Sequence, residues 1–311
     1  MRAPTIAPFA LPKNGELFTD TIIRRSEDLI ESGIWEGFEK VKLDTWLLNF
    51  TNTTEKYFAA CILDAFIYRS ERQTIALMKQ ILQRSIPDCL RLSNPVQGPS
   101  SNWFEQLVEN GNEKDPKIRI VPVIRDSDPP TKSGPLVARL YKRKMNINDK
   151  WMIWPWQISD AVKAGIQTFL FIDDFLGTGR QFYNFSNRFN LTAELSKSFA
   201  IYAPLVAHDK GVRFLRDKTP FIKVCSAESL DNTHSLFHQK SKWFNDGSNS
   251  PASALTYYKG ILINNRLTYS KNRSQGFGKL CIAYSFQHAI PNNCISILWN
   301  KSNSWKPLLG R

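Results

Sequence analysis

The chain has 311 residues, 42% of them hydrophobic and 22% charged. This composition excludes a disordered chain and is enough for one large domain, or for a core domain with an added helical part. The formal net charge of +13 favours polyanionic partners such as nucleic acid, nucleotides or polyphosphates, without choosing among them.

The first third of the chain has apolar residues at helical spacing. Thr19 and Asp20 are typical of an N-cap before a first helix, and aromatic residues predict two more helices, around 35–50 and 57–66. Ser70 and Gln73 have capping-box spacing before a fourth. Loops are expected at 85–101 and 110–116, which are rich in proline or polar residues. The resulting domain prediction is an N-terminal helical region over 1–113 and a second domain over 114–311.

From residue 114 onward, short apolar runs alternate with helical patterns. Strands are predicted at 118–124, 168–172, 199–206 and 221–224, and helices at 136–141 and 158–165. This alternation is typical of an α/β fold with a parallel sheet. Pro122 leaves the edges of the first strand open, because a proline is poor in a central strand. The last quarter of the chain is less regular.

The stretch FLFIDDFLGTGRQF, residues 169–182, has the strongest chemical signal. A buried strand ends in Asp173 and Asp174, which places both acids at the carboxyl edge of the sheet, where ligands bind in such folds. The turn Gly177-Thr178-Gly179 lets backbone N–H groups converge on an anion, and a helix beginning near Arg180 points its positive end at the same place. The motif predicts a phosphate cradle beside two carboxylates that can bind vicinal hydroxyls.

The acids and glycines of this loop admit three alternatives to a phosphate cradle for a sugar. A tight strand-to-helix turn with solvated acids is possible, but it does not account for adjacent acids at a strand end. A dinucleotide-binding loop is disfavoured, because its acid follows the glycines by ~20 residues. A Walker A loop is excluded, because no Gly-Lys-Ser/Thr follows.

The motif resembles the ribose-phosphate loop of type I phosphoribosyltransferases, which bind phosphoribosyl pyrophosphate. The resemblance implies that Asp173 and Asp174 hold the ribose hydroxyls and that Gly177, Thr178 and Gly179 hold the 5′-phosphate. It also implies Mg²⁺ bound mainly through the substrate pyrophosphate, with no protein residue assigned as a metal ligand. A side-chain nucleophile is not expected.

The same family binds pyrophosphate with a loop after the first core strand. The matching stretch here is 125–135, with Lys132, Ser133 and Gly134 as candidate ligands. Two positions depart from the family pattern. Gln181 stands where a second Thr or Ser is common, so that Arg180 is the alternative phosphate contact. Gly177 stands where purine-salvage members have an acid, which argues against that substrate class.

Over its whole length the chain resembles the phosphoribosyltransferase-like proteins of bacterial conflict and anti-phage systems, some of them retron-type systems that include reverse transcriptases. The segments LDTWLLNF, KSGP, DDFLGTG and GFGKLCIAYSFQHAIPNNCISILW carry this resemblance. It implies a phosphoribosyltransferase-like parallel sheet flanked by helices, with an N-terminal helical region and an irregular C-terminal hood.

The resemblance implies two functions, and the sequence does not decide between them. One is a defence enzyme that binds phosphoribosyl pyrophosphate or a related nucleotide with Mg²⁺ and acts at the anomeric carbon. The other is a catalytically inactive nucleotide-sensing or nucleoprotein-docking module on the same fold. A reverse transcriptase, an RNA–DNA hybrid or another defence protein is the partner that this setting implies.

Several further residues admit two interpretations each. His234 and His238 are four residues apart with no third metal ligand evident, so surface histidines are expected. His288 precedes Pro291-Asn292-Asn293, a segment that is either functional or turn-forming. A basic aromatic stretch is either a nucleic-acid surface with stacking rings or, as we expect, a solvated helix face beside core tryptophans. Its members are Arg139, Lys142, Arg143, Lys144, Trp151, Trp154 and Trp156.

The cysteines and the first residues bear on the compartment. The five cysteines form no CxxC pair, which argues against a disulfide framework or zinc site and favours a reducing cytosol. The start MRAPTIAPFALPKNG is interrupted by prolines, so no signal peptide is expected. No run approaches the ~18 apolar residues of a membrane span. We therefore expect a cytoplasmic protein with no membrane partner.

Overall fold

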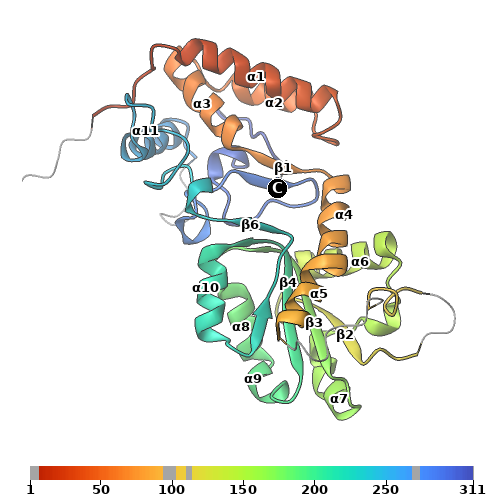
Figure 1. Ribbon diagram of the computed structural model, residues 1–311. Coiled ribbons are helices and arrows are strands. Elements are labelled where there is room, and N and C mark those ends of the chain that lie inside the picture. Colours follow the sequence, from red (N-terminus) through yellow and green to blue (C-terminus); the bar gives the residue numbers. More distant parts are fainter. Residues whose placement is uncertain (1–6, 94–102, 110–113, 268–273, 311) are drawn as a thin grey trace, which may run out of the picture. The chain divides into compact units, whose positions relative to one another are not determined.

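The computed structural model describes residues 7–93, 103–109, 114–267 and 274–310. Its contacts divide the chain into two compact units (Figure 1). Unit 1 comprises residues 1–71 and 231–311, and unit 2 comprises residues 72–230. Neither boundary coincides with the division at residue 113 that the sequence predicted. Among the described residues, no helix is both long enough and apolar enough to span a membrane.

Unit 1 combines helices from the start of the chain with elements from its end. The helices are α1 (Gly15–Glu31), α2 (Lys40–Leu47), α3 (Thr53–Ala65) and α11 (Pro251–Asn264), with the 3₁₀ turns η4 (Asn232–His234), η5 (Phe277–Lys279) and η6 (Ser296–Leu298). The strand β1 (Ile67–Arg69) pairs in parallel with β7 (Tyr284–Phe286). The last quarter, expected to be irregular, therefore contains a full helix, which begins with Pro251 after the N-cap Ser250.

The predicted helices of the first third are present, but two of them begin earlier than expected and α2 covers only part of the predicted stretch 35–50. α1 already starts at Gly15, so that the Thr19 hydroxyl lies inside the helix and donates to the Gly15 carbonyl at 2.8 Å. α3 starts at Thr53, because the Asn52 side chain accepts the backbone N–H of Glu55 at 2.9 Å.

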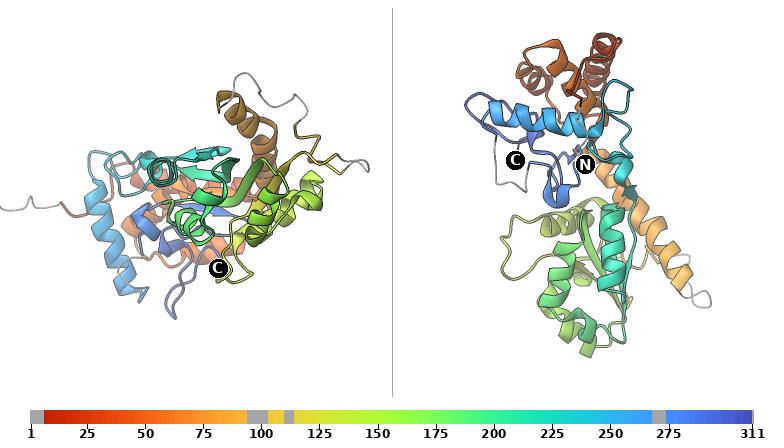
Figure 2. Two further views of the ribbon diagram at one scale, coloured as in Figure 1. Left: turned by 90° about the horizontal axis from the view of Figure 1, so that it is seen from below. Right: turned by 90° about the vertical axis from the view of Figure 1, so that its left-hand side faces the viewer.

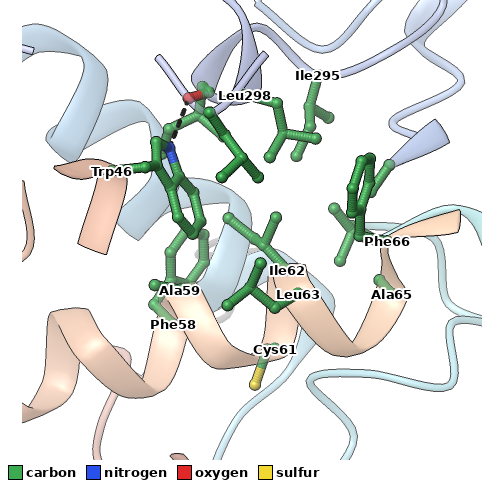
Figure 3. Packing of buried hydrophobic residues seen from close by; sticks show 14 of the residues in the cluster. Trp46, Phe58, Ala59, Cys61, Ile62, Leu63, Ala65, Phe66, Ile295 and Leu298 are labelled. Atoms are coloured by element: carbon green, nitrogen blue, oxygen red, sulfur yellow. Dashed lines mark hydrogen bonds between the residues drawn. The ribbon is translucent and has the colours of Figure 1, made fainter. Parts of the chain in front are cut away.

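The C-terminal segment completes the hydrophobic core of unit 1. Side chains of α3 point toward Ile295 and Leu298 (Figure 3). The Trp46 indole N–H donates to the Ile297 carbonyl at 3.2 Å, and Trp305 packs edge-on against the Phe50 ring at 5.2 Å. These contacts explain the difference in domain boundaries: the N-terminal helices bury their apolar faces against the end of the chain.

We predict that Trp305→Ala lowers the free energy of unfolding by about 3–5 kcal/mol, because it removes a fully buried ring and leaves a cavity. Urea-induced unfolding followed by circular dichroism measures the loss. The control is Trp156→Ala, whose side chain is 54% exposed and should change stability by less than about 0.5 kcal/mol. Equal effects of the two substitutions would contradict the assigned core.

Unit 2 is built on a parallel sheet with the strand order β2-β3-β4-β5. The strands are β2 (Ile118–Pro122), β3 (Thr168–Leu176), β4 (Phe199–His208) and β5 (Ile222–Val224), and β6 (Glu228–Leu230) also pairs with β4. Helices flank the sheet (Figure 2). The predicted α/β class and all the predicted strands are confirmed.

The helices of unit 2 are α4 (Glu71–Gln80, which begins at the unit boundary), α5 (Ile86–Ser93), α6 (Ser133–Met145), α7 (Ile158–Lys163), α8 (Arg180–Arg188), α9 (Leu191–Glu194) and α10 (Asp209–Lys218). The turns η2 (Asp149–Trp151) and η3 (Pro155–Gln157) lie between α6 and α7. Side chains from α7, α8, α9 and α10 join residues of β2, β3 and β4 in one hydrophobic cluster. α6 packs against β2 and β3.

The loop predicted to begin at residue 85 is wrong for residues 85–93, which are helical. Pro87 lacks an N–H and would break a regular helix, but a π-helical segment, η1 (Ile81–Ser85), directly precedes it. There the Ile86 N–H reaches back to the Ile81 carbonyl, so the helical path continues past the proline. The remainder of that predicted loop, and residues 110–113 of the next, lie outside the described residues.

Two prolines lie at places where the strand pairing of the sheet ends or is interrupted. Pro122 is the last residue of β2, an edge strand, where a missing donor is tolerated. Pro204 lies inside the central strand β4, opposite Asp173. On the far side of β4, residues 200–202 pair with β5 and residues 206–208 pair with β6. The neighbouring strand is therefore interrupted beside Pro204.

Candidate functional site

The two acids of the sequence motif lie inside β3 rather than after it. The strand continues through Leu176, and Gly177, Thr178 and Gly179 then form the turn into α8. Asp173 is 1% exposed and Asp174 is 7% exposed. The expectation of a strand that ends at the acids is therefore wrong by a few residues. The acids still precede a glycine turn at the carboxyl edge of a parallel sheet.

Asp173 accepts hydrogen bonds from four protein groups. Its Oδ1 accepts the Ser133 hydroxyl at 3.0 Å and the backbone N–H of Asp174 at 3.0 Å. Its Oδ2 accepts the Gln181 amide at 3.3 Å and the Tyr202 hydroxyl at 3.3 Å. A carboxylate offers about four lone-pair positions, so these donors saturate it.

Burial raises the pKa of Asp173 well above its usual value, and the charge of Asp174 adds to this effect. A hydrogen bond with the Asp174 side chain raises the pKa of Asp173 further.

Tyr202 was not singled out from the sequence. It lies on β4, is 1% exposed, and stacks on Phe182 of α8 with ring centroids 4.1 Å apart. Burial and the neighbouring Asp173 raise the pKa of its phenol, which therefore stays protonated as a donor. A hydroxyl in the middle of an apolar strand was the signal that could have identified it.

The second predicted loop reaches the same point. Ser133 is the first residue of α6 and contacts Asp173, while Lys132 is the N-cap residue. Gly134 follows, where an added Cβ would lie 2.8 Å from the Val123 carbonyl oxygen, so only glycine allows this approach. Arg125 and Asp128 close the loop ahead of α6 with an ion pair at 2.6 Å.

The glycine turn ends in a left-handed backbone conformation that favours glycine. Gly179 has a φ of 80° and is the N-cap of α8, and the side chain of Arg180 after it is exposed. The N-terminal turns of α6 and α8 thus both contact Asp173, through Ser133 and Gln181. The positive ends of two helices at one sheet edge are suited to an anion with more than one phosphate. Among the predicted phosphate ligands that the structure describes, Ser133 contacts Asp173 through a hydrogen bond. Lys132 directly precedes α6, and Arg180 is the first residue of α8.

The acids fit only a limited role toward Mg²⁺. The acceptor positions of Asp173 are occupied by protein donors, so it is a poor direct ligand. The part of the chain that the structure describes has no cluster of three or more acidic, cysteine or histidine side chains able to hold a metal. Asp174 together with substrate phosphates matches the way in which Mg²⁺ usually binds.

The histidines singled out from the sequence occupy turns of unit 1. His234 lies 3.0 Å from Asp231, and His238 accepts the backbone N–H of Lys240 at 3.1 Å, so the two do not share a helix face. His288 stacks on Phe286 at 5.1 Å. The Pro291–Asn293 segment forms a turn in which the Asn293 amide donates to the Phe277 carbonyl at 2.7 Å.

The basic aromatic stretch contains both buried and exposed tryptophans. Trp151 is buried as expected, with the Arg119 guanidinium 5.4 Å from its ring centre. Trp154 and Trp156 are 43% and 54% exposed and stack on each other at 5.2 Å, so the expectation of core tryptophans is wrong for this pair. Lys142 pairs with Glu109 and Asp149 at 3.1 and 3.4 Å, which fits the solvated helix face.

We predict that Asp173→Asn flattens the dependence of stability on pH. Because the folded pKa lies above the unfolded value of about 3.9, native Asp173 keeps its proton where the unfolded chain has lost it. Wild-type stability should therefore fall as pH rises from about 4 toward the raised pKa. Urea midpoints measured across this range would show the decline in the wild type and not in the variant.

The control is Asp115→Asn in the same unit. Hydrogen bonds from Arg119 lower the pKa of Asp115 to about 2, so this carboxylate stabilises the fold above pH ~4 and loses its effect as pH falls toward 2. Asp173→Asn should thus remove a loss of stability with rising pH, whereas Asp115→Asn should remove a gain of stability with rising pH. Identical profiles for wild type and Asp173→Asn would refute the assignment.

We predict that Gly179→Ala destabilises unit 2 more than Gly165→Ala does. Both glycines have a φ near +80°, which costs an alanine ~1–2 kcal/mol. At Gly179 the added methyl would also lie 2.8 Å from the Phe214 ring, whereas nothing lies within 4 Å at Gly165. Overpacking should add about 1–3 kcal/mol in the free energy of unfolding. Equal losses would exclude the close packing of the turn.

Comparison with known proteins assigns the chain to a family. The family model PRTase-CE matches residues 43–311, which include both loops of the site, the strands of unit 2 and the C-terminal segment of unit 1. No curated protein matches the chain. Since the match covers most of the sequence, the chain belongs to the PRTase-CE family and is a phosphoribosyltransferase-like protein.

Proposed function

We propose that this protein binds a phosphorylated ribose, either phosphoribosyl pyrophosphate or a related nucleotide, at the carboxyl edge of β3. The observation that carries the proposal is the convergence of two loops on one carboxylate. Ser133 and Gln181, each in the first turn of a helix, both donate to Asp173. The family membership and the net charge of +13 support a ligand with several phosphates.

The proposed roles differ for the two acids. Asp174 binds the ribose hydroxyls, whereas Asp173 is a positioning residue, because its acceptor sites are occupied by protein donors. The backbone of residues 177–179 and the Arg180 guanidinium hold the 5′-phosphate. Residues 132–134 hold the pyrophosphate, and Asp174 is the residue that would help to hold a Mg²⁺ brought in with that group, where the ion would neutralise phosphate charge.

The proposed reaction takes place at the anomeric carbon. The bond from that carbon to its leaving group breaks, an acceptor forms the new bond, and the charge of the departing phosphates is stabilised by the helix N-termini and Mg²⁺. The resemblance to retron-type anti-phage proteins supports a cytoplasmic defence role beside a reverse transcriptase, an RNA–DNA hybrid or another defence protein.

A second function has a specific observation in its favour. Gln181 donates to Asp173 at the position where relatives commonly have a hydroxyl residue, and the other acceptor positions of Asp173 are occupied by further protein donors. Such a site suits a nucleotide sensor or a nucleoprotein-docking module that binds the sugar phosphate without turnover.

We predict that Asp174→Asn weakens the binding of phosphoribosyl pyrophosphate at least tenfold, equivalent to about 1.4 kcal/mol, because an amide replaces the proposed ribose and Mg²⁺ ligand. Isothermal titration calorimetry with Mg²⁺ present measures the dissociation constant. Arg180→Ala should weaken binding similarly, while Arg139→Ala, an exposed arginine on α6, is the control with unchanged affinity. Unaltered binding by both Asp174→Asn and Arg180→Ala would contradict the proposal.

The same wild-type and variant proteins distinguish an enzyme from a sensor. An enzyme consumes phosphoribosyl pyrophosphate or a nucleotide, and consumption stops in Asp174→Asn while the circular dichroism spectrum is unchanged. A sensor binds the ligand without consuming it. Wild-type protein that neither binds nor consumes either compound would contradict both functions.

A further inference from the structure

Two cysteines of unit 2 meet beside the interruption between β5 and β6. Cys225 follows β5, and its backbone N–H donates to the Tyr202 carbonyl at 3.0 Å. Ala227 donates in turn to the Leu205 carbonyl at 3.1 Å, so the interrupted segment is anchored on both sides of Pro204. The position of the Cys225 backbone is therefore fixed by the central strand.

The helical segment that carries Cys89 is fixed to the same stretch. The Gln80 side chain of α4 donates to the Ala227 carbonyl at 3.0 Å, and the Ser85 hydroxyl of η1 donates to the Ser226 carbonyl at 3.1 Å. These bonds hold α5 against the segment after β5. The Cys89 side chain consequently forms a hydrogen bond with the Cys225 thiol.

Small molecules have access to the pair. Cys89 and Cys225 are both partly exposed and line a cavity of about 830 Å³. Asp88, Lys223 and Ser229 also line it together with apolar residues such as Phe199 and Val212, so the mixed lining admits a small hydrophilic oxidant such as a peroxide. By contrast, Cys61 in unit 1 is buried, as are Cys281 and Cys294.

We propose that Cys89 and Cys225 are a redox-modification site, a dithiol that a peroxide converts into a disulfide. In the first step one thiol attacks hydrogen peroxide, which gives a sulfenic acid and releases one water. In the second step the other thiol attacks this sulfur, the disulfide bond forms and a second water leaves. The two thiols are oxidised by two electrons in total, and the peroxide is reduced.

The hydrogen bond with Cys89 and burial raise the pKa of Cys225. Since the thiolate is the reactive species, crosslinking becomes faster as pH rises.

The pair is one strand removed from the candidate site. Cys225 bonds to the backbone of Tyr202, whose hydroxyl donates to Asp173. Tyr141 of α6, the helix that begins at Ser133, lies close enough to Cys225 for that thiol to influence the Tyr141 pKa. Oxidation of the pair needs no ligand at that site.

Thiol mapping of the full-length protein tests the proposal. Reduced protein is treated with hydrogen peroxide, denatured in an alkylating reagent and digested for mass spectrometry. We expect the loss of two of the five free thiols and one peptide pair crosslinked through Cys89 and Cys225. Cys225→Ser and Cys89→Ser should each give no crosslink, because one of the two sulfurs is missing.

Cys61→Ser is the matched control, because it removes a buried thiol outside the pair and should keep the crosslink. Circular dichroism spectra of all variants establish that they are folded. Full alkylation of both Cys89 and Cys225 in oxidised wild type would overturn the proposal. So would separate oxidation of each sulfur without a bond between them, or crosslinks to the cysteines of unit 1.

Discussion

The buried carboxyl group of Asp173 is the constraint on which the site of unit 2 depends. An isolated carboxylate away from water is costly, and this one is balanced by donors from three separate elements. Ser133 belongs to the start of α6, Gln181 to the start of α8 and Tyr202 to the central strand. Removing the carboxyl group would leave these donors without their common acceptor, so the positions of both candidate loops depend on it.

Close backbone packing supports the same arrangement from outside. Gly134 rests against the Val123 carbonyl, and an added Cβ at Gly211 in α10 would lie 2.5 Å from the Gly177 carbonyl. Glycine at these points brings α6 against the end of β2 and α10 against the glycine turn. The loops are thus held by main-chain contact as well as by hydrogen bonds, and preorganisation of this kind generally lowers the entropy cost of binding a ligand.

Much of the fold followed from local patterns. Every predicted strand of unit 2 is present, because short apolar runs between polar turns reflect a buried parallel sheet. The helical path through Pro87 was missed, since a π-helical segment is a matter of backbone adjustment that side-chain spacing does not reveal. The exposed Trp154–Trp156 stack was also missed: composition favours burying tryptophan, whereas here Pro155 is buried and the flanking rings lie outside.

The sequence alone determined the α/β class of unit 2 and the position of the loop from Asp173 to Arg180, because strand periodicity and turn-forming glycines are local properties. Only the tertiary structure decided that Asp173 is saturated by Ser133, Gln181 and Tyr202, that Cys89 meets Cys225, and that the end of the chain completes the core of the first helices. Each of these joins residues far apart in sequence. Their meeting depends on how whole elements pack, and no single segment encodes that packing.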